Sequence, residues 1–162
     1  MQPSPSGAAQ AVDPRRLFSG IWRGEGQLIP RGPARLVLGR ERVQITGSGE
    51  WLSASVWLVR ERFEMASGWA FERRMFMQLV APTRVRATAD DMPLGADVTL
   101  TADGFRFERF RSWLLYRGVR FRLGCCSSAR LDASGTLNGE VRLDLLRIPV
   151  ATLRLSIRVE MA

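Results

Sequence analysis

The sequence contains neither histidine nor lysine, so all 24 of its basic residues are arginine. Without histidine the chain cannot assemble a Ser-His-Asp or Cys-His catalytic set, a histidine-ligated haem or most kinds of zinc site. We therefore predict no catalytic residue set, no metal site and no cofactor. These absences weigh against an enzymatic function.

Cysteine is also scarce and occurs only as the adjacent pair Cys125-Cys126. Neighbouring cysteines rarely form an unstrained disulfide, because the bond demands a geometry that a short chain link distorts. On a strand, one of the two side chains would point inward and the other outward. We predict two reduced thiols that serve as small hydrophobic residues.

Long apolar runs are absent, and none approaches the roughly 20 residues that a transmembrane helix needs. Residues 1–12 lack the basic and apolar regions of a signal peptide. We predict a disordered tail over residues 1–12 and a single domain over residues 13–162. The expected location is the cytoplasm, or the periplasm if a signal has been trimmed from the chain.

The arginine content gives the chain a net charge of +8. A GC-rich genome that encodes arginine in place of lysine explains this without any function. The alternative is a basic surface that binds nucleic acid, anionic lipid or an acidic partner. Alternating Phe105-Arg106-Phe107 resembles a nucleic-acid motif, but strand alternation explains it equally well, so nucleic acid is not the expected partner.

From Ile21 onward, apolar and polar residues alternate as they do in half-buried strands. Before that point, Asp13-Pro14 provides a helix cap and a proline at the first helical position. These patterns predict an all-β fold, an up-and-down antiparallel barrel of roughly eight to ten strands after a short N-terminal helical segment. A β-sandwich is the rival architecture.

Two hairpins have a predictable register. Ala66-Ser67-Gly68 suits a three-residue loop with Gly68 in the left-handed conformation, which pairs Phe63 with Phe71 and Glu61 with Arg73. Asp103-Gly104 suits a two-residue turn, which pairs Ala102 with Phe105 and Leu100 with Phe107. The second register leaves Arg109 opposite Val98, so either Arg109 points inward or a bulge returns it to solvent.

Gly20-Ile21-Trp22 at the start of the first strand resembles the opening of lipocalin and calycin barrels. The segments Arg40–Ile45, Leu58–Phe63, Ser67-Gly68 and Arg73-Arg74 are similar to a bacterial family of uncharacterised lipocalin-like domains, many of them lipoproteins. The resemblance implies a barrel in which Gly20 and Trp22 form a structural plug. By analogy it also implies a small apolar ligand. The chain lacks a lipobox, which puts a membrane anchor in doubt.

The candidate ligand-binding residues follow from the two hairpins. If Glu61 and Arg73 face the interior, they must pair with each other, reach water or meet a ligand, because an unpaired buried charge is costly. A pair that merely fixes the strand register is the alternative. Asp90-Asp91 is expected to be solvated in its turn. The remaining candidates are Arg109 with Tyr116, and an apolar lining of Trp57, Phe63 and Phe71.

We therefore expect the barrel to bind or carry a small hydrophobic or amphipathic molecule, one with an acidic head group that Arg73 could hold. A second hypothesis is an arginine-rich module that binds an anionic polymer or the surface of a membrane. A third is a non-hydrolytic enzyme, an isomerase or cyclase, that uses Glu61 as its base. Peripheral membrane contact is compatible with the first two hypotheses, and the sequence says nothing about oligomeric state.

Overall fold

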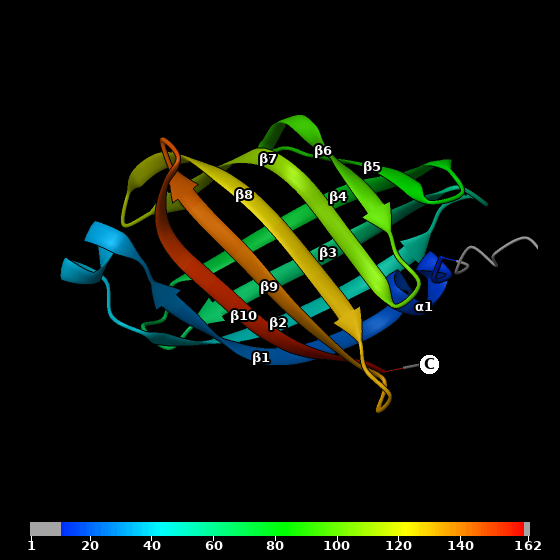
Figure 1. The fold of residues 1–162 in the computed structure, drawn as a ribbon, viewed down its shortest axis with the longest axis horizontal. Helices are drawn as coiled ribbons and strands as arrows, with labels where there is room; N and C mark the ends of the chain where they lie inside the picture. The colour runs from blue at the N-terminus through cyan, green and yellow to red at the C-terminus, as the bar shows by residue number, and fades with distance from the viewer. Residues whose placement is uncertain (1–10, 161–162) are drawn as a thin grey trace, which may run out of the picture.

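The structure is a computed structural model that describes residues 11–160, and these residues form one closed barrel of ten strands (Figure 1). A short helix precedes the barrel, and a single 3-10 helix lies between the first two strands. The elements are α1 (Pro14–Phe18), β1 (Gly20–Pro30), η1 (Gly32–Leu36), β2 (Glu41–Trp51), β3 (Val56–Met65), β4 (Ala70–Ala81), β5 (Arg84–Ala89), β6 (Met92–Leu100), β7 (Gly104–Tyr116), β8 (Val119–Leu131), β9 (Thr136–Leu145) and β10 (Ile148–Glu160).

Every strand pairs antiparallel with the strand that follows it, and β1 closes the barrel by pairing with β10. This is the up-and-down barrel that the alternating pattern predicts, with the expected short helix before it, and it rules out the sandwich. Closure satisfies the backbone groups that an open sheet would leave at its edges. Within residues 11–160, neither helix has the length or apolar character to span a membrane.

One end of the barrel is closed by α1 and by Trp22, which is 4% exposed. The Trp22 indole lies against the backbone of Gly47 on β2, where any side chain would overlap the ring. The neighbouring Trp51 indole donates to Ser19 Oγ over 2.7 Å, and the guanidinium of Arg15 stacks on the Trp51 ring. We call this the closed end.

The predicted tail falls mostly outside the described residues, since residues 1–10 are not among them. Val12, the last residue assigned to that tail, is buried in the core and donates its backbone N–H to the carbonyl of Thr101 over 2.7 Å. The ordered domain therefore includes at least this residue before α1.

The opposite end of the barrel carries four connections, which we call together the mouth. They are residues 31–40, which contain η1, and the loops of residues 66–69, 117–118 and 146–147. Figure 1 shows η1 and the β7–β8 and β9–β10 turns at this end, far from α1. The 31–40 segment is held there because the Arg31 backbone N–H donates to the Val150 carbonyl over 2.8 Å.

The predicted register of the β3–β4 hairpin is confirmed. Phe63 lies opposite Phe71, and Glu61 lies opposite Arg73. Gly68 has a φ of +87°, the left-handed conformation that the three-residue loop requires. The loop and the apolar pattern agree here, so the interior face of both strands was predictable.

The predicted register of the β6–β7 hairpin is wrong by two residues. Leu100 pairs with Phe105 and Val98 with Phe107, because the turn is made by Ala102 and Asp103 rather than by Asp103 and Gly104. Gly104 instead begins β7, where its missing side chain lets the strand lie against the backbone of Ala129 on β8.

Candidate functional site

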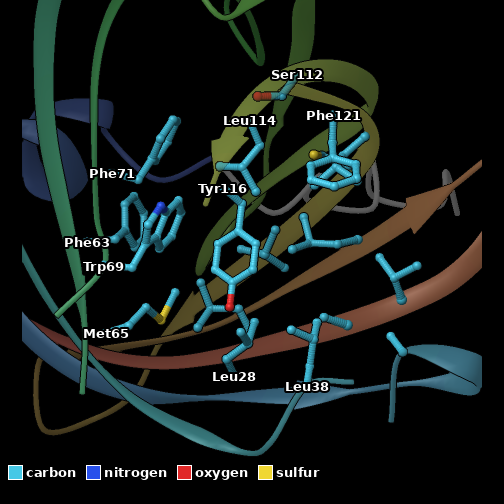
Figure 2. A pocket seen from close by; sticks show the side chains of 18 of the residues that line it. Leu28, Leu38, Phe63, Met65, Trp69, Phe71, Ser112, Leu114, Tyr116 and Phe121 are labelled. Atoms are coloured by element: carbon cyan, nitrogen blue, oxygen red, sulfur yellow. The ribbon is translucent and has the colours of Figure 1, made fainter. Parts of the chain in front are cut away.

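A cavity of about 410 Å³ occupies the half of the barrel nearest the mouth. Its walls are almost entirely apolar, and Figure 2 shows Phe63, Phe71 and Trp69 on one side, facing Leu114 and Phe121 across the space. The volume lies within the range of small-molecule sites in proteins. Residues of the 31–40 segment, including Leu38, cover part of the opening.

The cavity ends at the level of Arg73. Moving along β4 from the mouth, Phe71 and Arg73 line the cavity, whereas Met75 and Met77 belong to the packed core beyond it. Both methionines are almost fully buried. The barrel is therefore hollow toward the mouth and solid toward the closed end.

A polar cluster marks this inner end of the cavity. The Arg73 guanidinium donates to Asp91 Oδ2 from Nε over 3.0 Å and from Nη2 over 2.7 Å. The Ser112 hydroxyl donates to the same oxygen over 2.5 Å and accepts from Arg73 Nη2 over 3.1 Å. The side chains of Arg73 and Asp91 are 14% and 17% exposed, so this ion pair is largely shielded from water.

The cluster bridges a part of the barrel wall that lacks hydrogen bonds between strands. The β5–β6 hairpin ends at residues 90–91, well short of the mouth, so β4 and β7 have no strand between them beyond that point. Asp91 at the hairpin tip bonds Arg73 of β4 and Ser112 of β7, and its carbonyl accepts from the Trp113 backbone N–H over 2.7 Å. The three elements are thereby joined where the sheet hydrogen bonds stop.

Two aromatic residues continue this closure to the mouth. The Trp69 indole donates to the Leu115 carbonyl over 3.1 Å, and its ring meets Tyr116 edge to face at 5.5 Å between centroids. Trp69 also stacks on Phe71. Tyr116, Phe63 and Phe71 all line the cavity, and their contact with a ligand stays a prediction.

Glu61 lies on the interior face of β3, between Val59 and Phe63, but it is not among the residues that line the cavity. Burial raises the pKa of its carboxyl above the usual value of 4.5; Arg73 lowers that pKa and Asp91 raises it further. Arg73 bonds Asp91 rather than Glu61. A direct ion pair with Glu61, one of the alternatives left open by the sequence, is therefore not formed, and Asp91 is the counterion of Arg73.

Two predicted ligand-binding residues lie away from the cavity. A bulge between Phe107 and Phe110 places Arg109 on the outer surface, where its side chain is 54% exposed and bonds Asp144 Oδ1 over 2.6 Å. Trp57 is fully buried at the closed end, stacked on Trp51 at 4.5 Å between centroids. Trp57 does not reach the cavity, because it precedes Glu61 by four residues along β3 and therefore lies in the solid half of the barrel.

Asp91 and Ser112 are the site residues that the sequence did not predict, and Asp91 was expected to be solvated. The sequence did contain a hint of the role of Asp91. An arginine that faces the interior needs a carboxylate as its counterion, and Asp91 is one of the few carboxylates that are not on the exposed face of a predicted strand. Cys125 also lines the cavity, as the inward member of the cysteine pair, while Cys126 is half-buried. Burial raises the pKa of the Cys125 thiol to about 12.

No protein-family model matches the chain, and no curated protein sequence matches it. Solved structures do resemble it. The S-type phycobiliprotein lyase CPES from Guillardia theta superposes with a TM-score of 0.60 at 10% identity, over 89% of this chain and 88% of that chain. Rv2717c from M. tuberculosis superposes with a TM-score of 0.54 at 10% identity, over 89% of this chain and 93% of that chain. At this identity the similarity concerns the fold alone, a closed antiparallel barrel that fits the predicted calycin or lipocalin-like architecture, and the resemblance to the bacterial lipocalin-like family stays a prediction.

Proposed function

We propose that this protein binds a small, mainly apolar molecule inside its barrel. The observation that carries the proposal is the hollow half of the barrel, an apolar cavity of about 410 Å³ that opens at the mouth. Protein interiors are otherwise close-packed, and barrels of about this strand number either fill their interior with side chains or hold a small ligand there. The closed half of the same barrel is filled in that way.

The ligand in this proposal has one polar end, which lies at the Arg73 cluster. Asp91 accepts from Nε and Nη2 of Arg73, which leaves Nη1 without a protein acceptor among residues 11–160. A ligand oxygen could accept from that donor. A neutral carbonyl or hydroxyl suits the site better than the acidic head group expected from the sequence, because the Asp91 carboxylate already balances the guanidinium and would repel a second anion.

The phycobiliprotein lyase with a similar fold shows that such a barrel also occurs in a protein named as an enzyme. For this chain, the hypothesis of an isomerase or cyclase depends on Glu61 acting as a base. Its raised pKa suits acid–base chemistry. However, Glu61 does not line the cavity, and a general base must reach the proton that it removes. Binding without turnover is therefore the function that the geometry supports best.

A pair of tryptophan substitutions on β9 tests the proposal. Leu143 lines the cavity, whereas its neighbour Arg142 is exposed on the outer face. We expect Leu143→Trp to fill part of the cavity and to weaken binding of an apolar fluorescent probe, such as a naphthalene dye or a fluorescent fatty acid, by about tenfold or more. Arg142→Trp adds the same ring outside and should leave the affinity unchanged. Equal affinities in the two variants, or a wild-type protein that binds neither probe, would contradict the proposal.

A further inference from the structure

The mouth presents aliphatic side chains to solvent. Leu36 is 89% exposed, Val37 is 79% exposed and Leu146 is 88% exposed. Single exposed aliphatic residues are ordinary, but these gather on neighbouring connections, because the 31–40 segment packs against the start of β10. Further apolar side chains that are more than half exposed flank them at the adjoining strand ends, namely Leu115, Val119 and Ile148.

The β9–β10 turn holds one of these side chains in an unfavourable backbone conformation. Leu146 has a φ of 51° and Arg147 a φ of 69°, the pattern of a type I′ turn that Asn-Gly would adopt with ease. A leucine with a positive φ is a genuine outlier, and such strain gathers at functional positions. Here the strain places an exposed leucine and an arginine at the outermost point of the turn.

Basic charge surrounds the same apolar tips. The mouth and its flanking strand ends carry arginines but no acidic residue in residues 31–40, 66–69, 115–122 or 145–149. Three carboxylates border these stretches, and each is engaged: Glu41 accepts from Ser67, Glu64 pairs with Arg62, and Asp144 pairs with Arg109 and accepts from the Arg147 backbone N–H. No carboxylate of residues 11–160 forms an ion pair with any of the arginines in those four stretches, which are Arg31, Arg35, Arg40, Arg117, Arg120, Arg122 and Arg147.

We propose that the mouth docks onto the surface of an anionic lipid bilayer. The aliphatic tips would enter the boundary between head groups and acyl chains, and the unpaired arginines would contact lipid phosphates. A nucleic acid would use the arginines but would leave Leu36, Val37 and Leu146 in water, so the combination of charge and aliphatic tips favours a membrane. The docking does not depend on which molecule the cavity binds.

Sedimentation with lipid vesicles tests the docking. The wild-type protein should bind vesicles of phosphatidylcholine mixed with phosphatidylglycerol and should bind pure phosphatidylcholine vesicles much more weakly. Arg117→Gln with Arg147→Gln should weaken binding to the anionic vesicles by about tenfold or more. Arg130→Gln with Arg158→Gln removes the same charge from exposed positions near the closed end, where it should have little effect.

The apolar tips have their own matched pair of variants. Leu36→Ser with Leu146→Ser should weaken vesicle binding by about tenfold. Leu52→Ser with Val80→Ser, which changes exposed aliphatic residues near the closed end, should not. In addition, Leu146→Asn with Arg147→Gly should raise the thermal midpoint, because the turn is relieved of strain, and should still weaken vesicle binding.

Three results would overturn the docking proposal. One is a wild-type protein that does not bind the anionic vesicles. Another is an equal loss of binding in the mouth and closed-end arginine variants, which would mean that only net charge matters. The third is binding of duplex DNA, lost in the mouth variants, without binding of vesicles. Apolar probe binding, measured on the same samples, reports separately on the cavity.

Discussion

Arg73 Nη2 lies 2.7 Å from Asp91 Oδ2, and this contact joins β4 to the tip of the β5–β6 hairpin. The two residues are neighbours because that hairpin is short, so Asp91 reaches the level at which Arg73 faces the cavity. Ser112 bonds both partners and ties β7 into the same cluster. The pair therefore joins the barrel wall and lies at the inner end of the cavity, which Arg73 lines.

Removing the charge of Asp91 should destabilise the protein. Asp91→Asn leaves the Arg73 guanidinium without its counterion in a shielded position, and we expect a loss of about 1–3 kcal/mol in the free energy of unfolding. Urea denaturation measures this. The control is Glu108→Gln, which breaks the exposed Arg106–Glu108 pair and should change stability little. Equal effects from the two substitutions would show that the Arg73–Asp91 pair has no structural role.

The raised pKa of Glu61 predicts a specific dependence of stability on pH. In the unfolded chain this carboxyl titrates near its usual value of 4.5, whereas burial raises its pKa in the folded state. Between those two pKa values the folded state holds the extra proton, so rising pH should cost stability, by at most about 1.4 kcal/mol per pH unit. Above the pKa of Glu61 in the folded state, the loss of stability should be complete and should no longer change with pH.

The Glu61→Gln variant isolates this contribution, because other carboxylates titrate over the same range. The difference in unfolding free energy between wild type and variant should grow in favour of the variant as the pH rises above about 4.5. Urea denaturation at a series of pH values measures it. A difference that is independent of pH, or one that shifts in favour of the wild type as the pH rises, would refute the prediction.

The contact between Trp22 and Gly47 predicts that β2 tolerates no side chain at that position. Gly47→Ala would place a methyl group in the volume of the Trp22 indole and should destabilise the barrel by about 1–3 kcal/mol. Gly39→Ala is the matched control, because open space surrounds Gly39. Thermal unfolding of both variants decides the matter, and a Gly47→Ala protein as stable as Gly39→Ala would contradict a tight plug at the closed end.

The two cysteines should differ in reactivity. Cys125 is buried with its pKa raised to about 12, whereas Cys126 is half-buried on the other face of β8. The thiolate is the reactive form, so an aromatic disulfide reagent should modify one thiol quickly in the native protein and both thiols after denaturation. Cys126→Ser should abolish the fast reaction, and Cys125→Ser should preserve it. If both thiols reacted at the same rate in the native protein, the result would contradict the burial of Cys125.

The two hairpins show which parts of the fold could be predicted from the sequence. At Gly68 the turn and the apolar pattern demanded the same register, and the prediction was right. At Asp103-Gly104 two registers that differ by two residues leave the same side chains on the interior face. The apolar pattern cannot separate those registers, so the prediction depended on a turn that the chain does not use.

The candidate site was only partly predictable for a related reason. Alternation along β4 correctly puts Phe71 and Arg73 on one face, and both line the cavity. The partnership of Arg73 with Asp91 depends on how far the β5–β6 hairpin extends, and the position of Arg109 depends on a bulge. The bulge was one of the two alternatives that the sequence left open for Arg109, but the choice between them, like the reach of the hairpin, is decided only in the assembled sheet.

Native mass spectrometry of the gently purified protein tests the central proposal most directly, because it detects a bound molecule whatever the chemical identity of that molecule. We predict that wild-type protein carries a small apolar molecule from the expression host, that Arg142→Trp retains it, and that Leu143→Trp loses it. The contrary result would be an empty wild-type protein that also takes up no apolar probe, or a bound molecule that Leu143→Trp retains in full.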